Sequence, residues 1–196
     1  FTIGRDGTVK IFSGNDCQFG YRDSFFKTPE GKNFIVTSVT FGLKTNRALN
    51  LNYKDLKNYF SKTSVPPTLQ AVREAVLEIR QSKFPDLKTT GTAGSFFKNP
   101  IIPLAQFEEL KKKYPDLPGF PVSSDNGQMS NVKLHLAWIL DSILHLKGKM
   151  TGCVGLYHEQ PLVVVNEGGG TAAEVLKLVE EVALKVKEAT GIVLAW

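Results

Sequence analysis

Residues 91–100 read GTAGSFFKNP and combine glycines and small polar residues with two adjacent phenylalanines. They close a longer segment, beginning at Gln81, whose prolines and glycines predict a loop. Phe96 and Phe97 argue against disorder, since large apolar side chains favour burial. Ordered loops of this length are usually functional. The segment therefore separates two differently patterned regions and is the first candidate for a site.

The region before this segment is expected to be rich in strands. Apolar and polar residues alternate around Asp6-Gly7, a dipeptide that favours a tight hairpin turn. Residues 33–43 are rich in β-branched and aromatic side chains and predict a second extended stretch. Thr68 follows two prolines and predicts the start of a helix that ends near Arg80. The apolar face of that helix comprises Leu69, Val72, Val76 and Ile79.

The region after it alternates helices with short strands. Helices are expected over residues 103–113 and 132–146, joined by a surface connection rich in Pro, Gly and Ser. The apolar runs GCVGLY and PLVVVN predict neighbouring strands, with residues 158–160 forming a tight turn between them. The mixture of elements indicates an α+β fold.

The last helix carries the most complete set of signals. Thr171 and Glu174 have the spacing of a capping box, and Gly191 marks the C-terminal stop. Residues 191–196 are expected to begin another strand. The apolar stripe of the helix comprises Val175, Leu178, Val179, Val182 and Val186.

Composition limits the classes of function. The 196 residues are 42% hydrophobic, enough for a substantial core, and contain no apolar run long enough to cross a membrane. Cys17 and Cys153 lie far apart without metal-like spacing, which fits a reduced cytoplasmic protein better than a disulfide scaffold. Phe1 is not an initiator residue, so a preceding segment is expected to have been removed.

The formal charge of +5 would attract an anionic ligand. A nucleic-acid surface is the weaker interpretation, because aromatic residues do not alternate with basic ones as stacking sites would. The densest basic run, residues 111–113, continues a helical pattern and is better explained as a solvated helix face. No nucleic acid, membrane or metal ion is therefore expected as a partner.

Common catalytic and nucleotide-binding motifs are absent, and the three histidines are too dispersed to predict a metal site. Residues 168–170 form a glycine run before a helix, which could hold a phosphate but is better explained as a plain connection, since no lysine accompanies it. Ser95 has no local activating partner. From residue types alone, Ser95 is an ordinary turn or cap residue.

Three segments taken together resemble UDP-N-acetylenolpyruvoylglucosamine reductases. They are CQFGYRDS at residues 17–24, Arg80 with KFPD at residues 83–86, and GTAGSFFKNP itself. The first and third resemble the subclass whose substrate channel carries a tyrosine-bearing loop. The resemblance continues through Trp138, Asp141, Lys147-Gly148, the HEQPLVVVNE strand pair and the last helix, and so covers nearly the whole chain.

The resemblance implies a cytoplasmic oxidoreductase of peptidoglycan synthesis, an FAD flavoprotein that uses NADPH to reduce an enolpyruvyl UDP-sugar. The serine that matches Ser95 donates a proton in the family. A hydroxyl can do this when the acceptor carbon is an enol or carbanion beside a carboxylate, provided that neighbouring groups stabilise it.

The resemblance also implies the remaining site residues. Tyr21 matches the loop tyrosine that closes over the diphosphate, and Arg80 and Gly94 match positions close to the flavin. Phe120 occupies a position where a substrate-facing tyrosine can occur. The polar residues implied to line the UDP-sugar site are Lys83, Asn99, Lys147 and Gln160, which offer the ammonium and amide groups that a diphosphate and a uracil require.

The implied domains are the end of a FAD-binding, PCMH-like domain at residues 1–84, an α+β substrate-binding domain at 85–190, and a return strand at 191–196. The flavin-phosphate lobe and a catalytic arginine of the family have no counterpart here, and Leu194-Ala195-Trp196 stands where the family continues toward a catalytic glutamate. Leu136-Ala137 also replaces the usual Ala-Gly. We therefore expect a monomer that neither retains FAD nor turns over alone, with a UDP-sugar-binding module without catalysis as the alternative.

Overall fold

A computed structural model describes residues 1–45, 47–64, 66–122 and 130–196 of the chain. The chain separates into two compact units, Phe1–Ala48 and Leu49–Trp196. The first is a small antiparallel sheet with aromatic side chains around it. The second combines a helical hairpin with a larger α+β body, and it contains all but one of the candidate site residues.

The first unit contains β1 (Thr2–Gly4), β2 (Val9–Lys10) and β3 (Phe34–Val36), in the sheet order β2-β1-β3. The predicted hairpin between β1 and β2 is confirmed by the pairing of Thr2 with Lys10. Gly7 adopts a φ of 83°, which a residue without a side chain tolerates most easily. Only the start of the predicted extended stretch at residues 33–43 forms a strand, and the rest is irregular.

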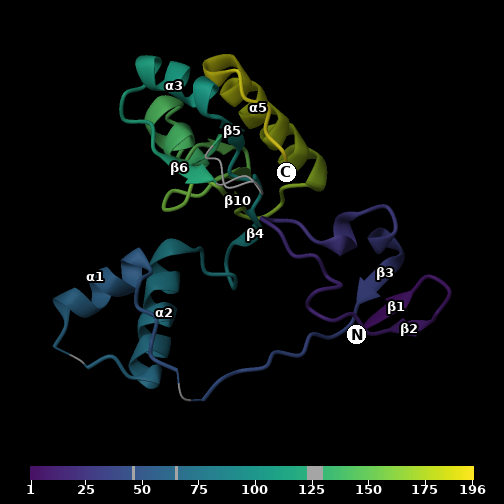
Figure 1. Ribbon diagram of the computed structural model, residues 1–196. Helices are drawn as coiled ribbons and strands as arrows, with labels where there is room; N and C mark the ends of the chain where they lie inside the picture. Colours follow the sequence, from purple (N-terminus) through teal and green to yellow (C-terminus); the bar gives the residue numbers. More distant parts are fainter. Residues whose placement is uncertain (46, 65, 123–129) are drawn as a thin grey trace. The chain divides into compact units, whose positions relative to one another are not determined.

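A helical hairpin opens the second unit (Figure 1). It consists of α1 (Lys54–Lys62) and α2 (Leu69–Lys83). The Thr68 hydroxyl accepts a hydrogen bond from Ala71 N at 3.1 Å, which confirms the predicted start of α2. The helix continues past Arg80 to Lys83, and α1 was not anticipated. Of the predicted apolar face, Leu69 remains 75% exposed.

A four-stranded antiparallel sheet has the order β4-β10-β9-β8. Its members are β4 (Gly91–Ser95), β8 (Met150–Thr151), β9 (Val154–Leu156) and β10 (Val163–Asn166). The predicted pairing of the last two is confirmed, with Val164 opposite Leu156. The loop prediction for residues 91–95 is wrong, because this glycine-rich segment pairs with β10 as an edge strand. Pairing to a strongly β-forming neighbour outweighs its weak intrinsic propensity.

A three-stranded antiparallel sheet comprises β5 (Ile101–Pro103), β6 (Gly119–Val122) and β7 (Asn131–Leu134), in the order β5-β7-β6. The helix predicted over residues 132–146 is therefore wrong at its start. Val132 and Leu134 are buried while their neighbours are half-buried, which is the alternation of a strand. The connection predicted before it includes β6 and the buried Leu117, and its residues 123–128 lie outside the described part of the chain.

Four helical elements complete this unit: α3 (Leu104–Lys113), α4 (Leu136–Trp138), a π-helical turn (Ile139–Ile143) and α5 (Ala172–Thr190). The predicted helix at residues 103–113 is confirmed by α3. Contacts join α5 to β9 and α3 to β5 and β7. The core lies between these helices and the sheets, and includes Phe97, Leu134, Leu140, Val164, Val179 and Val186.

Both ends of α5 confirm the sequence signals. The Thr171 hydroxyl accepts a hydrogen bond from Glu174 N, and Gly191 ends the helix with a φ of 72°. The strand predicted at residues 191–196 does not form. That segment has no regular secondary structure and contributes buried Ile192 and Leu194 to the core. Its hydrogen bond from Lys98 N to Ala195 O, at 3.0 Å, is too little pairing for a ladder.

Candidate active site

A cleft of about 880 Å³ lies between the C-terminal end of α2, the turn that follows it, and β4. Its wall combines apolar side chains with polar and charged ones. Its lining residues are Leu77, Arg80, Gln81, Phe84, Pro85, Asp86, Leu87, Lys88, Thr92, Gly94 and Val163. The two residues expected close to a flavin, Arg80 and Gly94, are both in this set.

Gly94 lies within a β-bulge of β4. The pairing advances by one residue on β10, from Val165 to Val164, but by two on β4, from Thr92 to Gly94. Gly94 has a φ of 69°, and a Cβ built on it would meet no atom within 4 Å. The bulge thus keeps a bare stretch of backbone facing open space, a common device beside functional sites.

The bulge also sets the direction of Ser95. Thr92 is opposite Val165 and Ser95 is opposite Val163. Val163 and Val165 are two residues apart and share one face of the sheet, so their partners share it as well. Val164 points to the other face and belongs to the core cluster. Ser95 therefore faces the side of the sheet that Thr92 and Val163 expose to the cleft.

The Ser95 hydroxyl makes no hydrogen bond within the described part of the chain, and the residue is exposed. The neighbouring Thr92 hydroxyl donates to Val164 O at 2.8 Å and accepts from Gly94 N at 2.9 Å, so it belongs to the bulge. Nothing near Ser95 would activate it as a nucleophile. A hydroxyl without a protein partner is available to a ligand.

The opposite wall of the cleft is formed by Arg80 and by the turn that follows α2. The Arg80 guanidinium lies over the Phe84 ring, 5.3 Å from its centroid. Asp86 fixes the turn, since its side chain accepts from Lys88 N at 3.0 Å and its carbonyl from Thr90 N at 2.9 Å. The cationic plane of Arg80 is thus held at the wall of the cleft.

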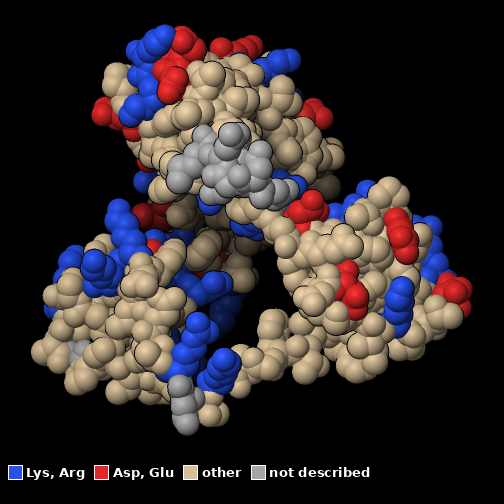
Figure 2. All heavy atoms as spheres, viewed as in Figure 1, with Lys and Arg blue, Asp and Glu red and all other residues tan. Residues whose placement is uncertain are grey.

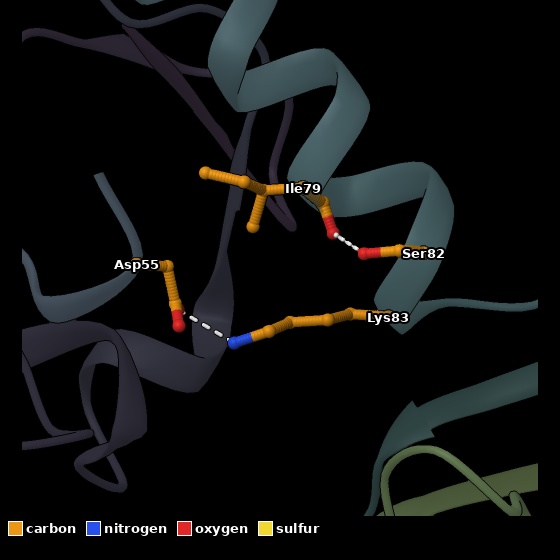
Figure 3. A network of polar contacts seen from close by, with 4 residues as sticks. All are labelled: Asp55, Ile79, Ser82 and Lys83. Atoms are coloured by element: carbon orange, nitrogen blue, oxygen red, sulfur yellow. Dashed lines mark hydrogen bonds and ion pairs between the residues drawn. The ribbon is translucent and has the colours of Figure 1, made fainter. Parts of the chain in front are cut away.

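Lys83, expected at the UDP-sugar site, is the last residue of α2 and forms an ion pair with Asp55 of α1 (Figure 3). The Nζ to Oδ2 distance is 2.5 Å. Asp55 could not be found from the sequence pattern, because the pair is 28 residues apart and α1 was not predicted. The only available signal was the spacing of Leu56, Tyr59 and Phe60, which favours an amphipathic helix.

Asn99 and Gln160 are half-buried, Asn99 between β4 and β5 and Gln160 between β9 and β10. Asn99 Oδ1 accepts a hydrogen bond from Leu136 N at 3.1 Å, which joins the GTAGSFFKNP segment to the start of α4. The Gln160 carbonyl accepts from Val163 N at 2.9 Å and closes the turn before β10. Neither residue lines the cleft, so the structure does not gather these two with Arg80 and Gly94.

Lys147 and Phe120 are more exposed. Lys147 Nζ lies 3.6 Å from Asp141 Oδ2, a separation that suits a weak surface pair. Phe120 is on β6 opposite Lys133 and is 53% exposed, like several other aromatic side chains of the chain. Both remain predictions as UDP-sugar contacts, and neither lines the cleft.

Tyr21 belongs to the first unit, where Gly20 and Asp23 close a tight turn. Tyr21 is 47% exposed on this turn, and Arg22 adopts a φ of 56°. A positive φ is costly for a residue with a side chain and is common at functional turns. Lys27 Nζ donates to Arg22 O at 2.7 Å and stabilises the turn.

The glycine run at residues 168–170 serves as a connection. Asn166 Oδ1 accepts hydrogen bonds from Gly168 N at 3.0 Å and Gly170 N at 3.1 Å. The Glu174 carboxylate accepts from Thr171 N at 2.7 Å at the start of α5. Because these N–H groups already have partners, the structure favours the connection over a phosphate site.

Other kinds of site find no support in the described ranges. No three His, Cys, Asp or Glu side chains there are grouped so that they could hold a metal ion. None of the helices described is both long and apolar enough to span a bilayer. Cys17 and Cys153 are free thiols.

Comparisons with known proteins identify the family of the chain. A profile of the C-terminal domain of UDP-N-acetylenolpyruvoylglucosamine reductase matches residues 85–196, more than half of the chain. The chain belongs to this reductase family. The matched region contains Gly94 and Ser95 together with Asn99, Phe120, Lys147 and Gln160, whereas Tyr21, Arg80 and Lys83 precede it.

Individual reductases of this name align with almost the whole chain. The protein of Bdellovibrio bacteriovorus is 40% identical over 186 residues, which are 95% of this chain and 53% of the relative. That of Flavobacterium johnsoniae is 40% identical over 94% of the chain, and that of Porphyromonas gingivalis 36% over 97%. The chain spans about half the length of the curated relatives it matches.

Proposed function

We propose that this chain provides the substrate-binding part of a reductase that converts UDP-N-acetylglucosamine enolpyruvate to UDP-N-acetylmuramate for peptidoglycan synthesis. The observation that carries the proposal is the α2–β4 cleft, whose lining includes Arg80 and Gly94. The strand register directs Ser95 to the same side. The cofactor held by Arg80 and Gly94 and the proton donor Ser95 can therefore reach the same substrate.

The residues at the cleft fit an FAD ring. Gly94 leaves open the space that any side chain would occupy, so a flat ligand can approach the backbone closely. Arg80 offers a planar cation able to stack on an aromatic ring or face its electron-rich edge. FAD, when bound, supplies the hydride that it receives from NADPH. The chain's own contribution is to hold the flavin edge and exclude water with Leu77, Phe84 and Leu87.

Ser95 completes the reduction by donating its proton to the carbon next to the substrate carboxylate. A serine hydroxyl is a weak acid, but a carbanion or enol at that position is a strong enough base to accept its proton. Ser95 needs correct placement more than a perturbed acidity, and the β-bulge supplies that placement. Its lack of a protein partner among the described residues leaves the hydroxyl free to face the substrate.

The UDP-sugar is bound by residues at the ends of strands and helices. Lys83, Lys147 and Tyr21 suit the diphosphate, and Asn99 and Gln160 suit the sugar or the uracil edge, because amides both donate and accept hydrogen bonds. The exposed Phe120 offers a flat apolar surface to the ligand. Basic side chains gather over the α1–α2 hairpin, which favours an anionic ligand (Figure 2).

The proposal extends to domain organisation. Residues 1–84 form the end of a FAD-binding domain, residues 85–190 form the substrate-binding domain, and residues 191–196 lead back toward the first. The protein acts as a cytoplasmic monomer. The two compact units divide instead between Ala48 and Leu49. Limited proteolysis therefore decides between the boundaries: cleavage near residue 84 supports this division, whereas cleavage near residue 48 with protection of residues 49–196 refutes it.

The proposed role of Ser95 predicts a specific kinetic defect in Ser95→Ala, measured in a full-length, FAD-loaded reductase that contains this chain. Reduction of the flavin by NADPH should proceed at the unchanged rate. Formation of the reduced UDP-sugar should fall by about 10²- to 10⁴-fold, the usual contribution of a general acid. Ser142→Ala, which removes an exposed hydroxyl that does not line the cleft, is the control and should cost much less. Equal losses in the two variants would refute a special role for Ser95.

A second candidate function is a UDP-sugar-binding module without chemistry. It is favoured by the position of the proposed sugar-binding residues outside the lining of the cleft that contains Arg80 and Gly94: Lys83, Asn99, Phe120, Lys147 and Gln160. Calorimetric titration with UDP-N-acetylglucosamine decides it. Binding without NADPH-dependent flavin reduction would support the module, whereas no heat at millimolar ligand would exclude UDP-sugar binding by this chain.

A further inference from the structure

The ion pair between Asp55 and Lys83 stands at the boundary of the proposed site. Lys83 ends α2 and is followed directly by Phe84 and Pro85 of the cleft wall. Its ammonium approaches Asp55 to 2.5 Å, and the side chains of Lys83 and Asp55 are 34% and 25% exposed. In Figure 3 the two side chains extend toward each other from separate helices. The pair is thus partly shielded but within reach of a ligand.

The hairpin has other contacts that hold α1 against α2. The Tyr59 hydroxyl donates to Glu78 Oε2 at 2.9 Å, and Leu56 is buried. Ion pairs at exposed positions contribute little to stability, so this one adds only modestly to those contacts. The more specific effect of the ion pair is to restrict Lys83, whose four-carbon side chain would otherwise sample many rotamers.

We propose that Asp55 is a positioning residue that holds the Lys83 ammonium in place for the diphosphate of the UDP-sugar. The inference rests on the proposed function, in which Lys83 contacts that ligand. An ammonium group has three N–H donors, and Asp55 uses one of them. Within the described residues Lys83 has no other partner, which leaves two donors for phosphate oxygens.

The negative charge of Asp55 has an opposite effect that must be weighed. A carboxylate near a diphosphate repels it and partly neutralises Lys83. Solvent and salt screen that repulsion because both side chains are partly exposed, whereas the hydrogen bond that fixes the ammonium is short and direct. Fixing a flexible side chain in advance lowers the entropy cost of binding. Positioning therefore outweighs repulsion.

The test is calorimetric titration of the 196-residue chain with UDP-N-acetylglucosamine. Asp55→Ala should weaken binding by about three- to tenfold, the usual scale for loss of one immobilising contact. Asp55→Asn keeps an oxygen acceptor at the same place and should restore most of the affinity. Tyr59→Phe removes the other cross-helix hydrogen bond without touching Lys83 and is the matched control, with unchanged affinity.

Two further variants separate the possible failures. In a Lys83→Met background, Asp55→Ala should have no additional effect, since the residue it positions is gone. If Lys83→Met binds normally, the assignment of Lys83 to the sugar site fails. If Lys83→Met weakens binding but Asp55→Ala does not, or tightens it, only the positioning role is overturned. Melting temperatures of Asp55→Ala and Tyr59→Phe show whether a loss of affinity follows a loss of folded protein.

Discussion

The two units of the chain differ most in how much apolar surface they bury. In the second unit, side chains from both sheets and from α3 and α5 meet in one continuous cluster of fully buried residues. In the first unit, Cys17 is the only hydrophobic residue in the buried class, at 9% exposure, within the part of the chain described. Its phenylalanines pack around Phe12 with ring centroids 5.1 to 5.3 Å apart, but stay partly exposed.

This difference bears on how the site works. Ser95 and Gly94 lie on a strand backed by the buried cluster, which suits groups that must be held to a fraction of an ångström. Tyr21 lies on a turn of the unit that buries little, where local opening costs least. The first unit also has an apolar groove of about 620 Å³. The proposed proton donor thus lies on a well-packed strand, and the tyrosine proposed to close over the ligand lies on a turn of the less buried unit.

The largest expected effect comes from truncating the core of the second unit. Leu134→Ala removes a fully buried side chain from β7 and should lower the free energy of unfolding by about 3 kcal/mol, because it leaves a cavity. Ile35→Ala in β3 removes a side chain that is 71% exposed and should cost less than about 0.5 kcal/mol. Urea unfolding followed by circular dichroism measures both. Equal losses of unfolding free energy in the two variants would contradict the difference in burial between the two units.

A smaller loss of stability is expected from adding a methyl group to a closely packed glycine of the second unit. A Cβ on Gly155 in β9 would meet the Met150 sulfur and, at 2.5 Å, the Lys149 carbonyl oxygen. Since backbone cannot yield easily, Gly155→Ala should cost about 2 kcal/mol. Gly14→Ala, in the first unit, meets nothing within 4 Å and is the control, with a change near zero. A Gly155→Ala protein as stable as the parent would show that the second unit is less tightly packed than its burial indicates.

Sequence-based prediction succeeded where the cause of a structure is local and failed where the cause is a tertiary contact. The hairpin at Asp6-Gly7 and the capped helix α5 were predictable, since their signals lie within a few residues of the structure they produce. β4 and β7 were not. Each takes its conformation from pairing with a strand distant in sequence, which overrides glycine-rich or helix-like local patterns.

For the candidate site, too, the sequence identified individual residues, and their spatial arrangement depended on tertiary contacts. Arg80, Gly94 and Ser95 were identified through their resemblance to a family. Only the structure shows that Arg80 and Gly94 line one cleft and that Ser95 follows Gly94 on β4 opposite Val163. The bulge that directs Ser95 depends on register, which no single segment determines. Asp55 could not have been identified at all, because its role depends on a helix-to-helix contact between residues 28 positions apart.

The smallest expected effect is the pH dependence of stability caused by two carboxylates, Glu174 in the capping box of α5 and Asp6 in the turn between β1 and β2. Hydrogen bonds from the backbone and side chain of Thr171 lower the pKa of Glu174 below its ordinary value of 4.5. Hydrogen bonds from Thr8 likewise lower the pKa of Asp6 in the first unit. A carboxylate with a lowered pKa in the folded state stabilises the fold above its unfolded pKa, and this contribution is lost as the pH falls toward the folded pKa.

Glu174→Gln should therefore lower the melting temperature at pH 7, and the difference from the parent should disappear as the pH falls below about 4. Gln keeps a capping oxygen, so the variant isolates the charge. Asp6→Asn removes a similar interaction from the unit that buries little, so it should alter hydrogen exchange near the hairpin without moving the main transition. If Asp6→Asn shifted that transition as much as Glu174→Gln, the two units would unfold together, and the strand carrying Ser95 could not be treated as independently stable.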